Sequence, residues 1–124
     1  MWFFDEEKLL LLHYKLIDRL GGSHELRDLN RIKSVLKAPK TNHYKTLFDK
    51  AAVYARNIIG DHLFVDGNKR TGITAAIIFL EKNNTPLYFA EGELEDFAVK
   101  IANNKLEIAA VSQWLENKAS DNGN

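Results

Sequence analysis

The chain has 124 residues, of which 45% are hydrophobic, and its 17 Lys and Arg balance 17 Asp and Glu to a formal net charge of zero. Such values are typical of a folded globular domain and argue against disorder, collagen and coiled coil. The balanced charge gives no electrostatic reason to expect nucleic acid or a membrane surface as a partner, and the absence of cysteine excludes disulfides, thiolate zinc sites and a cysteine nucleophile.

The N-terminal region carries no sign of a membrane segment or a secretory signal. Its longest apolar run, Leu9–Leu12, is far shorter than the roughly 18 residues that a spanning helix needs. The acidic start Asp5-Glu6-Glu7 is wrong for a signal peptide, which places positive charge before an apolar stretch. We therefore expect a cytoplasmic protein.

The sequence indicates six helical segments, five of which show an apolar repeat with helical spacing. The first helix follows Asp5, a favourable N-cap, and ends at Gly21-Gly22, whereas the second, 30–37, must stop near Pro39. The third ends at Gly60 and the fourth begins near Gly67-Asn68. The repeating apolar positions are, in chain order, Leu9, Leu12, Leu16, Leu20; Leu47, Ala51, Tyr54, Ala55, Ile58; Ile73, Ala76, Ile77, Leu80; Leu94, Phe97, Ala98, Ile101; and Ile108, Val111, Leu115.

This pattern predicts an all-α bundle of about six helices, with residues 1–119 as one domain and residues 120–124 as a frayed tail. The stretch Leu87–Phe89 is expected to be a short extended piece. The polar stretch Lys37–Thr46, which contains Pro39, lacks helical periodicity. It is interpreted either as a surface loop or as a flap over a cleft.

Residues 62–71, His-Leu-Phe-Val-Asp-Gly-Asn-Lys-Arg-Thr, concentrate polar side chains between two apolar helices. The start of the fourth helix presents unpaired backbone N–H groups and the positive end of the helix dipole, which together favour anions. Gly67 allows a ligand to approach the backbone, Asn68 offers a neutral donor, and Lys69 and Arg70 add two cations. These residues predict a phosphate-binding loop.

Asp66 and His62 supply the reactive groups of this segment. A carboxylate beside a phosphate-binding loop is typical of a Mg²⁺ site completed by phosphate oxygens and water, and Asp66 is equally suited to cap the helix. His62 suits a general base that takes a hydroxyl proton, although a lone histidine is more often bonded to local backbone. Phe64, between them, is expected to point inward and anchor the loop.

The segment resembles the signature of the Fic/Doc family, H-x-F-x-[DE]-x-N-[GK]-R, at every defined place. The matching residues are His62, Phe64, Asp66, Asn68, Lys69 and Arg70. The resemblance implies a Fic/Doc-type helical fold with a short flap loop or hairpin that aligns a target segment. It also implies His62 as the catalytic base, Asp66 as the Mg²⁺ ligand, and ATP bound by Gly67, Asn68, Lys69, Arg70 and Thr71.

The residue at position 69 separates two chemistries within this family. Fic enzymes, which transfer AMP to a protein hydroxyl, carry Gly there and Pro after the histidine, whereas Lys69-Arg70-Thr71 and Leu63 are similar to the Doc (death-on-curing) toxins. Gly67 matches the Fic form. The Doc form implies an inverted nucleotide, with its γ-phosphate facing His62, and phosphorylation of a Ser or Thr of elongation factor Tu that halts translation. A Fic-type AMP (nucleotidyl) transferase and a non-catalytic nucleotide- or partner-binding module remain the alternatives.

Two expectations concern regulation. The stretch Ser112–Asn117 matches the pattern [ST]-x-x-x-E-[GN] of the inhibitory helix in Fic proteins, in which Glu116 would reach Arg70. The same residues fit an ordinary last core helix with Ser112 and Glu116 as solvated neighbours, which we favour. Resemblance to Doc implies instead a separate antitoxin protein whose disordered tail folds over the toxin.

Overall fold

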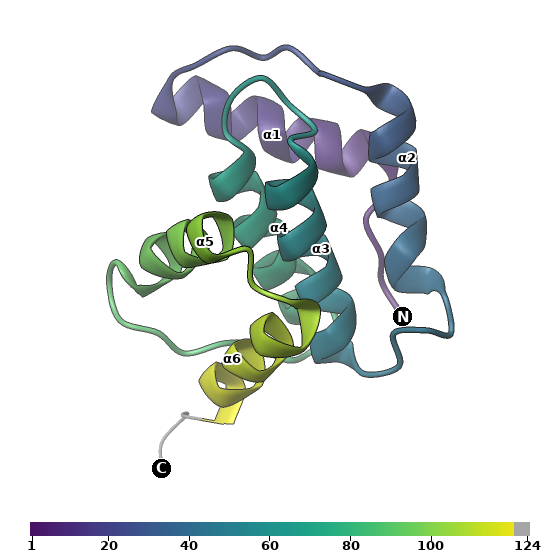
Figure 1. Cartoon of the computed structure of the whole chain (residues 1–124), viewed down its shortest axis with the longest axis vertical. Coiled ribbons are helices and arrows are strands. Elements are labelled where there is room, and N and C mark those ends of the chain that lie inside the picture. Colours follow the sequence, from purple (N-terminus) through teal and green to yellow (C-terminus); the bar gives the residue numbers. More distant parts are fainter. Residues whose placement is uncertain (121–124) are drawn as a thin grey trace.

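Six α-helices build the fold of the computed structural model, which describes residues 1–120 (Figure 1). They are α1 Glu6–Leu20, α2 Leu29–Lys37, α3 Leu47–Asp61, α4 Asn68–Lys82, α5 Glu93–Asn104 and α6 Ile108–Ser120. The predicted all-α bundle is confirmed, and Leu87–Phe89 joins no strand. Of the tail expected at 120–124, residues 121–124 lie outside the described residues, so the division into domain and tail stays a prediction.

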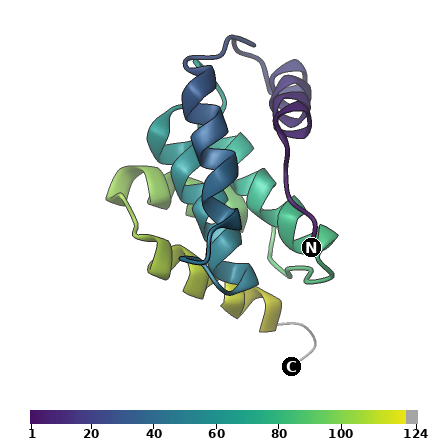
Figure 2. The same cartoon turned by 90° about the vertical axis from the view of Figure 1, so that its right-hand side faces the viewer.

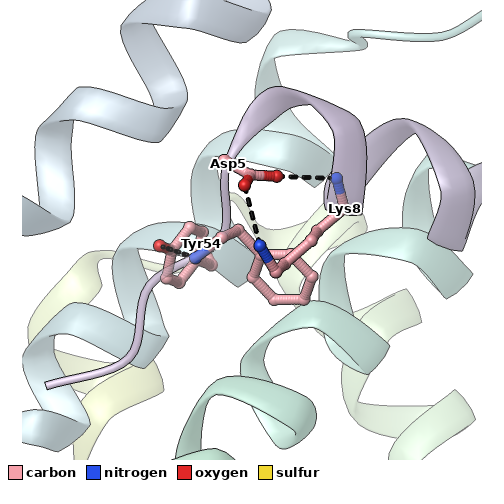
Figure 3. A network of polar contacts seen from close by, with 4 residues as sticks. Asp5, Lys8 and Tyr54 are labelled. Carbon is pink, nitrogen blue, oxygen red and sulfur yellow. Dashed lines mark hydrogen bonds and ion pairs between the residues drawn. The ribbon is translucent and has the colours of Figure 1, made fainter.

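Two hydrogen bonds, shown in Figure 3, fix the N-terminal segment. The Asp5 side chain accepts the backbone N–H of Lys8 at 2.8 Å and so caps α1, which ends at Gly21 with φ 91° as the two glycines predicted. The Phe4 N–H donates to the Tyr54 hydroxyl at 3.2 Å. Burial raises the pKa of Tyr54 to about 12, so the phenol stays neutral and holds the segment that precedes α1 against α3.

Pro39 changes the helix type rather than ending the helical conformation. α2 stops at Lys37, and a single 3₁₀ turn, η1 Ala38–Lys40, follows it with Pro39 in its first turn. Proline fits there because the first N–H groups of a helix need no intrahelical partner. Pro39 is buried, so the chain stays packed against the bundle at this point.

The core is built around α3 and α4, which pack against each other along their length (Figures 1 and 2). α6 covers α3, α5 lies against α4, and α1 and α2 cover the remaining sides. The close approach depends on small residues, since a methyl group built on Gly72 would lie 2.7 Å from Ile59 Cγ1. The connection 62–67 between α3 and α4 is thereby placed at one end of the rigid central pair.

None of the helices in residues 1–120 combines the length and the apolar character needed to cross a bilayer.

Candidate functional site

A cavity of about 520 Å³ opens where α3 ends, α4 begins and α5 passes beside them. Its volume falls within the roughly 300–1,000 Å³ of small-molecule sites. Six of the residues singled out by the sequence line it: His62, Asp66, Gly67, Asn68, Lys69 and Arg70. The apolar wall comes from α3, α4, α5 and the connection between α3 and α4, and Glu95 of α5 adds a carboxylate. The apolar residues are Ile59, Val65, Ile73, Ala98, Val99 and Ala102.

His62 ends α3 in a left-handed conformation, with φ 49° and ψ 59°. A residue with a Cβ adopts this conformation at a cost of about 1–2 kcal/mol relative to a right-handed one. The exposed imidazole is thereby turned out of the helix at the mouth of the cavity. Backbone strain of this kind is concentrated at functional sites, where the surrounding structure maintains it.

Asn68 closes the loop between the two helices. Its side-chain oxygen accepts the Phe64 N–H at 3.0 Å and its amide group donates to the Phe64 carbonyl at 2.8 Å. The Phe64 ring is fully buried, as predicted. The Asn68 side chain therefore stabilises the conformation of the loop. Only its second N–H remains for the phosphate contact that its sequence position suggested.

The N-terminus of α4 is free of side-chain caps. Gly67 is its N-cap, with φ 82° and ψ 17°, and carries no capping side chain, so Asp66 does not fill that role. The N–H groups of Asn68, Lys69 and Arg70 precede the first intrahelical bond, which Thr71 N–H donates to Gly67. An uncapped helix end flanked by Lys69 and Arg70 on a cavity is suited to bind a phosphate group.

Asp66 is held by a segment that precedes α2. Its Oδ2 accepts the Ser23 N–H at 2.7 Å, and a methyl group on Gly22 would lie 3.0 Å from the Asp66 Cβ. Gly22 has φ 113°, so glycine is required there both by conformation and by space. The Oδ1 atom of Asp66 has no partner within residues 1–120, which leaves one carboxylate oxygen for a ligand.

Arg70 pairs with a residue that the sequence did not single out. Its guanidinium Nη1 lies 2.7 Å from Oε1 of Glu95, on the first turn of α5. Both side chains are partly exposed, at 39% and 47%, so the pair is weak and open to competition by another anion. Local spacing carries no signal for this contact, because 25 residues separate the partners.

The model of the Fic/DOC family matches residues 3–80. The chain belongs to the Fic/DOC family. The match includes α1, the loop 62–67 and nearly all of α4, whereas Glu95 lies beyond it.

Two Doc proteins are similar to this Fic/DOC chain over most of their length. "Protein kinase doc" of Escherichia phage P1 is 29% identical over 113 residues, which cover 88% of this chain and 89% of that protein. "Toxin Doc" of Mycolicibacterium smegmatis (strain ATCC 700084 / mc(2)155) is 29% identical over 102 residues, 77% of this chain and 78% of that protein.

Thr71 does not share the cavity with the rest of the signature. The Thr71 side chain is fully buried and does not line the cavity, and the Thr71 N–H donates to the Gly67 carbonyl at 2.9 Å. The fourth residue of the helix turns toward the core, and the Thr71 hydroxyl is buried there without a hydrogen-bond partner among the described residues. The expected nucleotide contact of Thr71 stays a prediction.

The stretch Lys37–Thr46 is not a flap over this cavity. It precedes α3, whereas His62 follows it, and a 15-residue helix is about 22 Å long (Figure 1). The buried Lys50 ammonium donates to the carbonyl groups of Pro39 at 2.8 Å and of Tyr44, which fixes the stretch at the far end of α3. The segment beside the signature is instead Ser23–Arg27, where Arg27 N–H donates to Leu63 and Val65 N–H to Glu25.

α6 packs where a last core helix was expected. The Ser112 hydroxyl donates to Oδ1 of Asp49 at 2.7 Å, on the first turn of α3 and thus at the end remote from His62. Arg70, the residue that Glu116 was considered to reach, is paired with Glu95. This placement favours the ordinary core role of the Ser112–Asn117 stretch.

A second cavity of about 390 Å³ adjoins the first and shares Ile59, His62 and Ala102 with it. Arg56 and Lys105 line it from α3 and from the residue that follows α5. His62 thus lines both cavities, whereas the other cavity-lining residues of the signature line only the first. Within residues 1–120 no group of three His, Cys, Asp or Glu side chains is arranged to hold a metal ion by itself.

Proposed function

We propose that this Fic/DOC chain is a Doc-type toxin that transfers the γ-phosphate of ATP to a Ser or Thr hydroxyl of a translation protein, elongation factor Tu by resemblance. The observation that supports the proposal is the gathering of His62, Asp66, Lys69 and Arg70 on one cavity at an uncapped helix start. The name of the phage P1 relative, a protein kinase, points the same way.

The proposed reaction is an in-line phosphoryl transfer. His62 takes the proton of the target hydroxyl, whose oxygen forms a bond to the γ-phosphorus while the bond between that phosphorus and the bridging oxygen breaks and ADP leaves. Arg70, Lys69 and the first N–H groups of α4 bind phosphate oxygens and stabilise their charge. The second cavity leaves open space on the other side of His62 for the target chain.

The residues present fit a Mg²⁺ ion that is held partly by the substrate. Mg²⁺ is commonly bound by one or two carboxylates together with nucleotide phosphates and water, so the lack of a three-residue cluster is no obstacle. Asp66 presents one carboxylate oxygen beside the phosphate-binding helix end. When bound, the ion would neutralise phosphate charge, and Asp66 would hold it in place.

Lys69 is proposed to set the direction of the nucleotide. Its exposed side chain lines the cavity at the place where Fic enzymes have glycine. We propose that the bulk and charge of this side chain exclude an α-phosphate that faces His62. AMP transfer is the competing reaction, and Gly67 is the feature of this signature that favours it.

Label transfer tests the proposal directly. Purified protein and Mg²⁺ are added to a translating cell extract with ATP labelled at either the γ- or the α-phosphate, and His62→Gly serves as the inactive control. We expect label on a protein of elongation-factor size from γ-labelled ATP only. Label from α-labelled ATP only would establish nucleotidyl transfer, and no label from either would leave a binding module as the function.

Removal of the Glu95 carboxylate should strengthen nucleotide binding. Glu95→Gln frees Arg70 for phosphate, and because the pair is exposed we expect the dissociation constant of the nucleotide to fall by about 2–5-fold at low salt and by less at high salt. Isothermal titration calorimetry at two salt concentrations measures this. Glu91→Gln, an exposed carboxylate just before α5, is the matched control, and an equal gain in it would show that only net charge matters.

The antitoxin and the cytoplasmic site of action belong to the same proposal. The M. smegmatis relative is named a toxin, which fits a chain that is neutralised by a separate partner protein. Co-expression with the product of a neighbouring small gene should restore growth of cells that this chain arrests.

A further inference from the structure

Outside the signature, a buried histidine of α1, His13, contacts its loop directly. The His13 residue is only 2% exposed, and its Nε2 lies 2.8 Å from the backbone carbonyl oxygen of Asp66, 53 residues away in the sequence. A carbonyl oxygen only accepts hydrogen bonds, so Nε2 carries the proton and donates. His13 does not line either cavity that contains His62.

The ring of His13 makes two further contacts with the same loop. It stacks on Phe64 with ring centroids 3.7 Å apart and planes inclined by 6°. A methyl group built on Gly67 would lie 3.7 Å from His13 Nε2 and 2.9 Å from Ile17 Cδ1, one turn further along α1. One face of α1 therefore touches the loop at Phe64, Asp66 and Gly67.

We propose that His13 is a positioning residue of the active site, one that fixes the backbone of Asp66 so that the Asp66 carboxylate presents its free oxygen to a Mg²⁺–nucleotide complex. The inference rests on the proposed function of Asp66. His13 and Ser23 act on the same residue from two sides, because His13 holds the Asp66 carbonyl and the Ser23 N–H holds Oδ2.

A purely space-filling role does not account for a histidine at this place. A buried polar ring is disfavoured unless it is hydrogen-bonded, and an apolar side chain would fill the same volume without that requirement. Burial also lowers the pKa of His13, which keeps the ring neutral with a single N–H to donate. That N–H is directed at the backbone carbonyl of Asp66, the residue proposed to hold the ion.

Two variants separate the hydrogen bond from the packing. His13→Phe keeps a ring to stack on Phe64 and removes the donor, whereas His13→Gln loses the ring and places an amide N–H near the position of Nε2. His43→Phe makes the same exchange in the stretch 37–46, remote from the cavity, and serves as the control. Binding of ADP with Mn²⁺, a spectroscopic substitute for Mg²⁺, is followed by calorimetry and paramagnetic line broadening, and thermal unfolding is recorded for each variant.

Loss of an outer partner of a metal ligand typically weakens metal binding by 10–100-fold. We expect His13→Phe to weaken metal-dependent ADP binding about 10-fold with little change in metal-free ADP binding, and His13→Gln to recover most of the loss even where its Tm is lower. Equal metal-dependent binding in His13→Phe and the wild type would overturn the positioning role. The role would also be overturned if both variants lost metal-dependent ADP binding in proportion to the fall in their Tm, whether or not the hydrogen-bond donor is present.

Failure of the proposed function gives a different result. If the wild-type protein binds ADP equally with and without Mn²⁺, the assignment of Asp66 as a metal ligand is wrong. In that case amide hydrogen exchange at Asp66 and Gly67 still tests the contact itself. Exchange at these two amides should accelerate in His13→Phe and return toward the wild-type rate in His13→Gln, and unchanged exchange in His13→Phe would contradict the contact.

Discussion

Replacement of His62 by glycine is expected to abolish phosphoryl transfer and at the same time to stabilise the folded chain. A positioned general base typically contributes 10²–10⁴-fold to the rate, and no other histidine lines the cavity, so transfer should fall by that factor or more. Stability should rise because glycine adopts φ 49° without strain and the imidazole is exposed, with little packing to lose.

The expected gain is about 0.5–1 kcal/mol in the free energy of unfolding, since relief of the strain is partly offset by the greater freedom of glycine in the unfolded chain. This corresponds to a rise of a few degrees in Tm. Denaturant unfolding and label transfer are measured on the same preparation. Opposite changes in stability and activity distinguish an active-site residue from one that merely supports the fold.

Asn84→Gly is the matched control for this experiment. Asn84 also has a positive φ, 62°, but it is exposed and follows α4 at the end away from the cavity. Asparagine tolerates this conformation better than most residues, so a gain of a few tenths of a kcal/mol with full activity is expected. A stable His62→Gly variant that still transferred label would remove His62 from the mechanism.

Replacement of Gly72 by alanine is expected to destabilise the fold. The added methyl group would lie 2.7 Å from Ile59 Cγ1 and 3.0 Å from the backbone carbonyl oxygen of Ala55. The carbonyl belongs to α3 and cannot turn aside, so α3 and α4 must separate. Overpacking of this kind costs about 1–3 kcal/mol.

The separation should also reduce activity, because the two helices carry the two halves of the site. His62 ends α3, whereas the phosphate-binding residues begin α4, and Ile59 lines the cavity between them. Chemical denaturation and ADP binding measure the two effects. Unfolding at the same denaturant concentration as the wild type would show that the helices have room to adjust.

Gly60→Ala is the control for this change. Gly60 lies in the last turn of α3, and nothing is found within 4 Å of a methyl group built on it. Alanine is favoured over glycine in a helix by up to about 1 kcal/mol, so this variant should be more stable than the wild type. The same substitution is therefore expected to change the free energy of unfolding in opposite directions at two positions on the facing helices.

Much of this fold was predictable because the signals for helices are local. Asp5 caps its own helix three residues later, Gly21 ends it, and the start of α4 at Gly67-Asn68 follows from a glycine and the polar run that surrounds it. The signature was equally accessible, since six cavity-lining residues lie within nine positions of one loop and helix start. Side chains so close in sequence stay close in space, whatever the rest of the chain does.

Residues that support or oppose the site were not predictable in this way. His13, Ser23 and Glu95 lie 53, 43 and 25 residues from their partners, and each taken alone fits an ordinary position on a helix or in a loop. Their roles depend on where α1 and α5 cross the ends of α3 and α4. Thr71 shows the converse, because it belongs to the signature run by sequence and yet turns into the core.

The helices, the family and the loop that carries the candidate chemistry could be inferred from sequence, because capping, periodicity and a contiguous motif act over a few residues. The packing of the helices was needed to show which carbonyl accepts the His13 N–H and which carboxylate competes for Arg70. It also places the stretch 37–46 at the end of α3 remote from His62. These relations are set by how the helices pack and by the lengths of the segments between them, and no local pattern encodes either.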